Sequence, residues 1–94
     1  MKELIFKLTQ GEIKNGYVRV KSFATDLSQT LWGGKNKAEA ASDMLKINFQ
    51  GEVIYSDIDE TKQIIRKRFG KYMNEKSYAK IEIISDKEIN LIFL

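Results

Sequence analysis

The chain has 94 residues, with 16 lysines and arginines, 13 aspartates and glutamates, and a formal net charge of +3. It contains no cysteine and no histidine, which excludes disulfides, thiolate metal sites and the most common general base and metal ligand. This length fits one domain, residues 1–94, with a thin core. No apolar run approaches the ~20 residues of a membrane helix, so we expect a cytoplasmic protein without a membrane segment, metal or cofactor.

The N-terminal part of the chain predicts two strands and a turn. Glu3–Leu8 alternates with the two-residue period of a strand. In Tyr17–Lys21, a second predicted strand, two valines face away from three polar or amphipathic side chains. Thr9–Gly16 lies between the strands and contains an Asn-Gly pair, a strong reversal signal, so we expect a turn there.

A short helix and a loop are predicted next. Over Ser22–Trp32, apolar side chains recur at helical spacing, and Ser22 is placed to cap the helix. Gly33-Gly34 stops this pattern. The polar residues 35–42 are therefore expected to form a loop.

The middle of the chain predicts three more strands. Leu45–Phe49 and Glu52–Tyr55 form a hairpin through a tight turn at Gln50-Gly51. Thr61–Arg66 is rich enough in β-branched residues to be a strand that pairs back on the hairpin.

The last part predicts a helix and a closing hairpin. Arg68–Lys76 suits a helix, although Gly70 weakens that assignment by about 1 kcal/mol relative to alanine. Tyr78–Ile84 and Ile89–Phe93 form the closing hairpin. The predicted fold is thus mainly β (α+β), with seven short strands and two short helices.

Positive charge is concentrated in one part of the chain. The window from Thr61 to Tyr72 has five cations and no anion. The cations are Lys62, Arg66, Lys67, Arg68 and Lys71. Two other segments add positive and amide side chains: Lys14, Asn15, Tyr17, Arg19 and Lys21 in the first, and Lys35, Asn36 and Lys37 in the second. Clustered charge of this kind predicts a polyanionic partner, most commonly nucleic acid.

Two short segments match parts of enzyme motifs. Val53–Thr61 ends in D-x-D-x-T and resembles the nucleophile loop of haloacid-dehalogenase phosphatases. It lies past mid-chain, so we expect no room for the lysine and carboxylates that the reaction needs. Glu60-Thr61-Lys62, with Asp43 upstream, matches part of a metal-dependent nuclease pattern, but the match is too short to carry weight. The chain is therefore predicted not to be an enzyme.

Three motifs in order resemble those of prokaryotic B3-like DNA-recognition domains. The first is I-K-N-G-Y-V-R-V at Ile13–Val20, and the second is G-G-K-N-K at Gly33–Lys37. The third runs over Ser56–Arg68 and ends in R-K-R. The chain departs from the family at Lys76–Ala79, where a Gly-Asp turn is usual.

This resemblance implies a seven-stranded open β-pseudobarrel with two short flanking helices. In that fold two arms grip one major groove, and here they correspond to Gln10–Ser22 and Ser56–Arg68. The implied function is sequence-specific binding of double-stranded DNA, with a link to restriction–modification and a nuclease or methyltransferase as a further partner. The alternative is a small protein-interaction module, such as an inhibitor or accessory subunit.

The predicted DNA-binding residues fall into two groups by chemistry. Cations suit phosphates, whereas amides, arginine and acids suit base edges. For phosphates we predict Lys14, Lys21, Lys62, Arg66, Lys67 and Arg68. For bases we predict Asn15, Arg19 and Gln63, with Asp59 or Glu60 as acceptors from cytosine. Tyr17, Lys35, Asn36, Lys37 and Asp57 complete the predicted interface.

Overall fold

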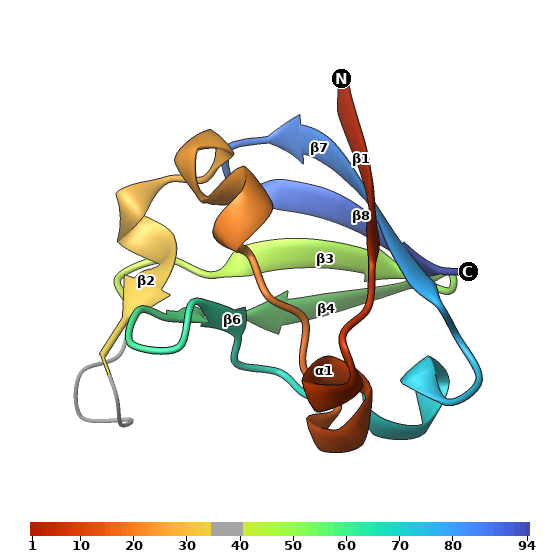
Figure 1. Cartoon of the computed structure of the whole chain (residues 1–94). Helices are drawn as coiled ribbons and strands as arrows, with labels where there is room; N and C mark the ends of the chain where they lie inside the picture. The colour runs from red at the N-terminus through yellow and green to blue at the C-terminus, as the bar shows by residue number, and fades with distance from the viewer. Residues whose placement is uncertain (35–40) are drawn as a thin grey trace.

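Five strands form the larger of two sheets, in the order β1-β7-β8-β3-β4 (Figure 1). All neighbouring pairs are antiparallel except β3 and β8, which are parallel. The computed structural model describes residues 1–34 and 41–94. The strands are β1 (Lys2–Lys7), β3 (Leu45–Phe49), β4 (Glu52–Ser56), β7 (Tyr78–Ser85) and β8 (Glu88–Phe93).

The second sheet has three two-residue strands in the order β2-β5-β6. They are β2 (Trp32–Gly33), β5 (Ile58–Asp59) and β6 (Ile64–Ile65). Residues 17–20 attach to β6 by one antiparallel bridge, Arg19 to Ile64. Two backbone hydrogen bonds, from Val20 N to Gln63 O and from Ile65 N to Val18 O, are both 2.9 Å long. We call residues 17–21 the first basic segment and residues 57–68 the second, and these contacts place the two side by side.

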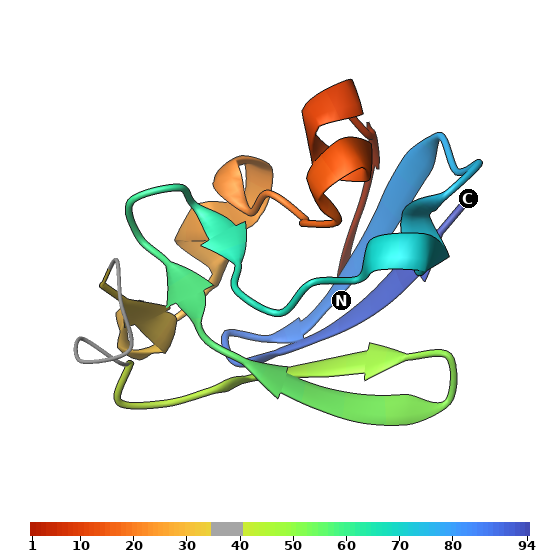
Figure 2. The same ribbon diagram turned by 90° about the horizontal axis from the view of Figure 1, so that it is seen from below.

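Short helical segments cover the ends of the sheets (Figure 1). α1 (Gln10–Asn15) is the one α-helix of the described residues. The 3₁₀ helices are η1 (Lys21–Asp26), η2 (Gln29–Leu31) and η4 (Gly70–Met73). Seen from below, strands of both sheets and these helices surround a common interior (Figure 2).

Alternation along the strands builds the core. In β3, Leu45, Ile47 and Phe49 are buried, while the residues between them remain partly exposed. The buried cluster also includes Ile58 and Ile65 of the small sheet, so the two sheets share one core. No helix in the described residues is long and apolar enough to cross a membrane.

Five of the predicted strands are confirmed with small changes of boundary, and so is a mainly β fold. The predicted strand Leu45–Phe49 has the observed bounds of β3. The hairpin turn at Gln50-Gly51 is also confirmed. Both turn residues have positive φ, 52° and 77°, as the twist of a two-residue hairpin favours.

The N-terminal predictions need two corrections. Thr9–Gly16 is not a simple turn, because α1 occupies most of it. Thr9 and Glu12 form a capping box at its start, and Gly16 ends it in a left-handed conformation at φ 73°. Tyr17–Lys21 is not a regular strand and pairs only through the bridge described above, although its valines point inward as predicted.

The predicted helix Ser22–Trp32 is broken in two. Phe23, Leu27 and Leu31 are buried as their spacing suggested. Leu27 itself is extended, however, and separates η1 from η2. Ser28 N donates to Asp86 O in the β7–β8 turn, 2.9 Å away. This bond to a neighbouring turn replaces the helical bond that Ser28 would otherwise make.

The predicted helix Arg68–Lys76 shortens to η4 for a backbone reason. Gly70 has a φ of 48°, outside the helical range, and Asn74 is extended. Gly70 also lies against Gly16, where an added Cβ on Gly16 would come within 2.8 Å of Gly70 N. Because the backbone of Gly70 lies so close to Gly16 and has a positive φ, a regular helix cannot begin at Arg68 and continue through Gly70.

The strand count also differs from the prediction. The described residues hold eight strands in two mixed sheets that do not close into a barrel. Thr61–Arg66 contributes only β6, which pairs with β5 rather than with Glu52–Ser56. The two-residue strands are too short for a repeating pattern to predict them.

Candidate nucleic-acid interface

Glu12 links the first basic segment to α1 through hydrogen bonds. Its side chain is buried, and Oε1 accepts from Thr9 N at 3.0 Å as part of the capping box. Oε2 accepts from Arg19 N at 3.2 Å. Because the backbone at Arg19 is held between Glu12 and β6, the side chains of Arg19 and Lys21 project outward while Val18 and Val20 lie in the core.

Tyr17 brings one arginine from each basic segment together. The guanidinium carbon of Arg68 lies 5.2 Å from the centre of the Tyr17 ring, and that of Arg19 lies 5.8 Å away. Arg19 Nη2 also donates to Tyr17 Oη at 3.3 Å. The pKa of Arg19 is raised above its ordinary value, chiefly by this hydrogen bond. Two exposed guanidiniums are thus held close to one ring.

Arg66 is engaged inside the second segment. Its Nε donates to Asp57 Oδ1 at 2.8 Å, and its Nη1 lies 3.7 Å from Asp59 Oδ2. Nη2 donates to the Gly34 carbonyl. The hydrogen bond to Asp57 is the main reason that the pKa of Arg66 is raised. Both carboxyl residues are only 6% exposed.

These contacts revise three of the predicted roles. Asp57, Asp59 and Arg66 are committed to one another, which leaves the acids poorly placed to meet a base edge and the arginine poorly placed to meet a phosphate. Their position suits support of the arm rather than contact with a partner. The burial of this cluster could not be predicted from charge alone, since Asp57 lies between β4 and β5 whereas Arg66 follows β6, and only the folded chain brings them together.

Asp59 shapes the loop between β5 and β6. Its Oδ1 accepts from Thr61 N at 2.9 Å and from Lys62 N at 3.2 Å. Gln63 N donates to Asp59 O at 2.7 Å. Gln63 has a φ of 55°, a left-handed conformation that costs a side chain other than glycine about 1 kcal/mol. The loop therefore projects Lys62 and Gln63 from a fixed base.

A polar hollow of about 340 Å³ lies where the two segments meet. Exposed side chains surround it from both segments. Its lining is Arg19, Lys21, Thr61, Lys62 and Gln63. With Arg68 beside Tyr17, these cations and Gln63 form what we call the arm face: Arg19, Lys21, Lys62, Gln63 and Arg68.

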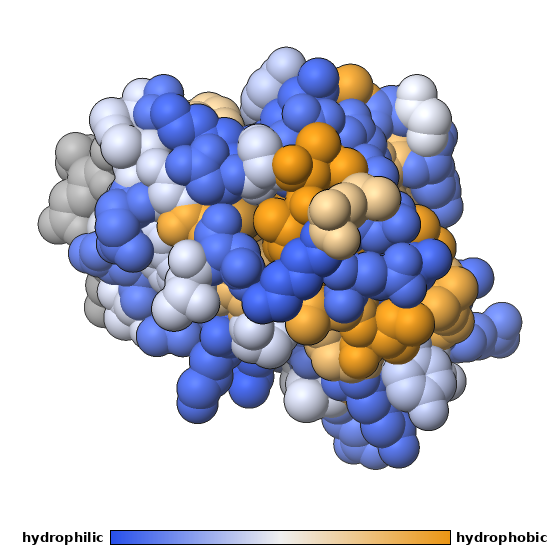
Figure 3. Space-filling model, turned by 90° about the horizontal axis from the view of Figure 1, so that it is seen from above, coloured by the Kyte–Doolittle hydropathy of each residue, from blue (hydrophilic) through white to orange (hydrophobic). Residues whose placement is uncertain are grey.

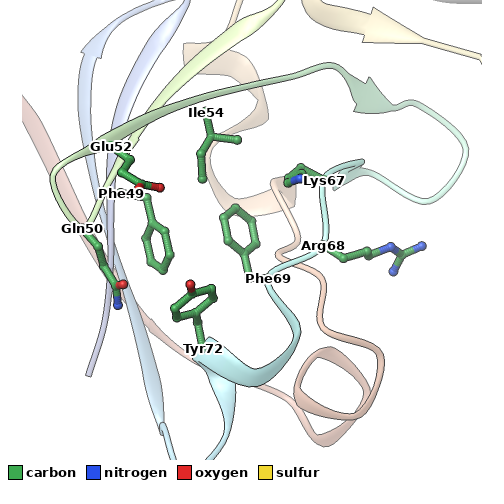
Figure 4. A pocket seen from close by; sticks show the side chains of 8 residues that line it. All are labelled: Phe49, Gln50, Glu52, Ile54, Lys67, Arg68, Phe69 and Tyr72. Atoms are coloured by element: carbon green, nitrogen blue, oxygen red, sulfur yellow. The ribbon is translucent and has the colours of Figure 1, made fainter.

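A second hollow, of about 150 Å³, has a different character (Figure 4). Phe49 packs edge-on against Phe69 at 5.3 Å and against Tyr72 at 5.2 Å between ring centres. The side chain of Arg68 extends away from this hollow (Figure 4). The hollow is therefore an opening in the aromatic core, and Arg68 belongs to the arm face. Lys67, whose N donates to Ser56 Oγ at 2.9 Å, lines the hollow.

The cations of the arm face have no acidic partner among the described residues. Every ion pair of the described chain, apart from those of Arg66, lies elsewhere. These pairs are Lys2–Asp26, Lys46–Glu88, Lys80–Glu3 and Lys87–Asp43. Within residues 17–21 and 57–68, which are fully described, Glu60 is the one exposed acid. The arm face thus carries a positive charge that no acid of the described residues neutralises through an ion pair.

The remaining predicted residues are less closely gathered. Lys14 is exposed in the last turn of α1. Asn15 Nδ2 donates to Gly11 O at 2.8 Å, so its amide already serves the helix. Lys35, Asn36 and Lys37 lie outside the described residues.

Two supporting residues were missed by sequence reasoning. Glu12 was not selected, although Thr9-x-x-Glu12 is the pattern of a capping box and was open to prediction. Ser56 is buried, donates from Oγ to Asp57 O at 2.8 Å and accepts from Lys67 N. No local signal marks a serine for such a role.

The chain was also compared with known proteins. No family model, no curated protein and no solved structure matches it. The function proposed below therefore rests on the geometry just described and on the resemblance drawn from the sequence.

Proposed function

We propose that this chain binds double-stranded DNA through the arm face. The observation that carries the proposal is the meeting of two basic segments at the Arg19–Ile64 bridge, with four exposed cations that have no acidic partner among the described residues. Duplex DNA carries a dense line of phosphates, which such a surface complements. Within residues 17–21 and 57–68, the acids other than Glu60 are buried.

The proposal assigns different tasks to the side chains of the arm face. Lys21, Lys62 and Arg68 neutralise phosphates and set the position on the duplex. Gln63, at the tip of a loop braced by Asp59, has an amide that can pair with adenine, and Arg19 has a fork that fits guanine. Among the described aromatic residues, Tyr17 is the one that packs against arginines of the face, and it is partly buried beneath them. Single-stranded nucleic acid would need open stacking platforms, so we favour a duplex.

The finer fold assignment is part of the same proposal. A B3-like, seven-stranded open pseudobarrel would place the segments Gln10–Ser22 and Ser56–Arg68 as two arms in one major groove. The pairing of residues 17–20 with β6 supports two neighbouring arms. A link to restriction–modification, with a nuclease or methyltransferase as partner, follows from this family alone and extends the proposal further.

Selection from a random duplex pool, followed by a salt titration, tests the proposal. We expect one enriched sequence and a log–log slope of affinity against salt of about −3 to −4, because four cations would each displace about one counterion. A flat dependence of affinity on salt would show that the proposed phosphate contacts are not made. Binding without an enriched sequence would remove base recognition but leave non-specific DNA binding.

A second candidate is a protein-interaction module. It is favoured by hydrophobic side chains that gather on the face seen from above (Figure 3). Ile5, Ile84 and Ile92 are 56%, 43% and 38% exposed on β1, β7 and β8. A partner held by this face would be retained after nuclease treatment and lost in Ile92→Lys, whereas loss in Arg68→Gln would favour the DNA proposal.

A further inference from the structure

A hollow of about 470 Å³ opens beside the arm face, between β1, α1 and the segment that leads into η1. Its volume lies within the range of about 300–1,000 Å³ that small-molecule sites occupy. Its lining is Phe6, Glu12, Arg19, Lys21 and Ser22. Neither the proposed DNA contacts nor the core requires a hollow at this place.

The floor of this hollow is apolar and held from behind. The Phe6 ring is partly buried and stacks on Phe23, with 6.4 Å between ring centres. Phe23 is fully buried, so it fixes the Phe6 ring in place. Glu12 faces the hollow too, but its carboxylate accepts from Thr9 N and Arg19 N. The acid is therefore already satisfied by backbone donors.

The rim of the hollow is positive. Arg19 and Lys21 are both exposed, and both line this hollow and the neighbouring polar hollow, so their side chains reach the surface on the same side. Arg19 is also oriented by its hydrogen bond to Tyr17 Oη. Ser22, next in the chain, adds a hydroxyl. An apolar floor beside two cations and a hydroxyl complements an anion with an apolar body.

We propose that this hollow binds a small organic anion. Its aromatic or branched aliphatic body lies over Phe6, and its carboxylate, sulfonate or phosphate group pairs with Arg19 and Lys21. The same two side chains line the polar hollow between the basic segments. The ligand and the duplex therefore compete for them, so that binding of the anion releases DNA. This last step, unlike the site itself, rests on the proposed function.

The probe 8-anilinonaphthalene-1-sulfonate tests the site without DNA. We expect one probe molecule to bind the folded chain saturably, and the increase in probe fluorescence measures this binding. Arg19→Gln removes one cation, and Ser22→Trp fills the hollow from its exposed rim, so each should weaken binding at least tenfold. Lys80→Gln, a charge change on the five-stranded sheet, should leave it unchanged. Probe binding that persists in both Arg19→Gln and Ser22→Trp would place the probe elsewhere and overturn the site.

Competition with the selected duplex tests the antagonism. At a probe concentration ten times its dissociation constant, the apparent dissociation constant of the duplex should rise about tenfold. In Ser22→Trp the probe should no longer change it. If the probe occupies the hollow and duplex affinity stays the same, the antagonism is overturned. If no duplex binds at all, the proposed function fails while the result for the hollow stands.

Discussion

The five-stranded sheet and the arm face both carry charged side chains, but the two regions differ in how these charges are paired. On the outer side of the sheet, Lys80 pairs with Glu3 and Lys46 pairs with Glu88. Asn48 donates there to Glu88 and to Asn90. Beside the arm face, Asp57 and Asp59 are buried as supports, and the cations of the face stand without acidic partners among the described residues. A modest net charge can therefore conceal a concentration of positive charge on one surface. That surface is what a polyanion would meet.

The largest expected effect comes from breaking the buried support of the arm. Asp57→Asn removes the charge that Arg66 faces, so we expect a loss of about 2–3 kcal/mol in the free energy of unfolding. Arg66 keeps some access to water, which places the value at the low end for a buried pair. Urea unfolding measures it. Glu3→Gln, which breaks an exposed pair on the sheet, should cost at most about 0.5 kcal/mol; equal costs would erase the contrast between the regions.

The two regions should also differ at glycines of the same backbone conformation. Gly16 and Gly51 have φ of 73° and 77°. An added Cβ at Gly16 would meet Gly70 N at 2.8 Å, whereas at Gly51 it would meet nothing within 4 Å. Gly16→Ala should therefore cost about 2–3 kcal/mol in stability and Gly51→Ala about 1 kcal/mol. The midpoints of thermal unfolding of the two variants compare these costs. Similar midpoints would contradict the close approach between α1 and η4.

Matched charge removal tests the proposed binding. Arg68→Gln takes a cation from the arm face, and Lys80→Gln takes one from the sheet. We expect Arg68→Gln to weaken duplex binding about tenfold and to reduce the salt slope by about 1. Lys80→Gln should change neither quantity. A fluorescence anisotropy titration measures both, and a comparable loss in Lys80→Gln would mean that net charge, not the arm face, controls binding.

A smaller and more selective effect is expected at two glutamines. Gln63 in the β5–β6 loop and Gln50 in the β3–β4 turn have φ of 55° and 52°. Replacing either by glycine relieves the strained conformation, so each variant should be as stable as the parent or about 0.5 kcal/mol more stable. Only Gln63→Gly should change the preferred duplex sequence. Repeating the selection with both variants checks this, and an unchanged preference in Gln63→Gly would exclude Gln63 from base recognition.

The smallest effect is expected at an exposed ion pair of the sheet side. The pKa of Asp43 is lowered, first by its hydrogen bond from Lys87 and then by one from Thr30. Because the folded pKa lies below the ordinary carboxyl value, the contribution is complete above that value and is lost as pH falls through the folded pKa. Lys87→Gln should leave stability at neutral pH without measurable change. A pH titration of Asp43 by NMR should show its pKa rising in this variant.

The sheet could be predicted from sequence because its signals are local. Alternation of apolar residues gave the bounds of Leu45–Phe49, and the Gln50-Gly51 turn joined it to its partner. The two-residue strands of the small sheet carry no such period, and their pairing depends on the rest of the fold. The Asn15-Gly16 pair was misleading, because a glycine at positive φ ends a helix as readily as it turns a hairpin.

The candidate site was predictable only in outline. Clustered charge pointed to the segments that the structure brings side by side. The same charge could not separate exposed cations from Arg66, since burial of the Asp57–Arg66 pair is decided by tertiary contacts. The supporting acids were consequently predicted to face the partner. Sequence alone indicated the two segments, and the packing of Asp57, Asp59 and Arg66 shows which of their side chains are buried or engaged with one another.

The pairing of β1 with β7 has a consequence for how the chain is made. β1 is an edge strand whose partner follows it only after every other strand except β8 has been synthesised. At about 5–20 residues per second on the ribosome, the segment with Ile5 and Phe6 waits for seconds without its neighbour. Such a non-local pairing slows folding and leaves an apolar strand open to other chains. Growth at lower temperature and slower induction should therefore raise the yield of soluble protein.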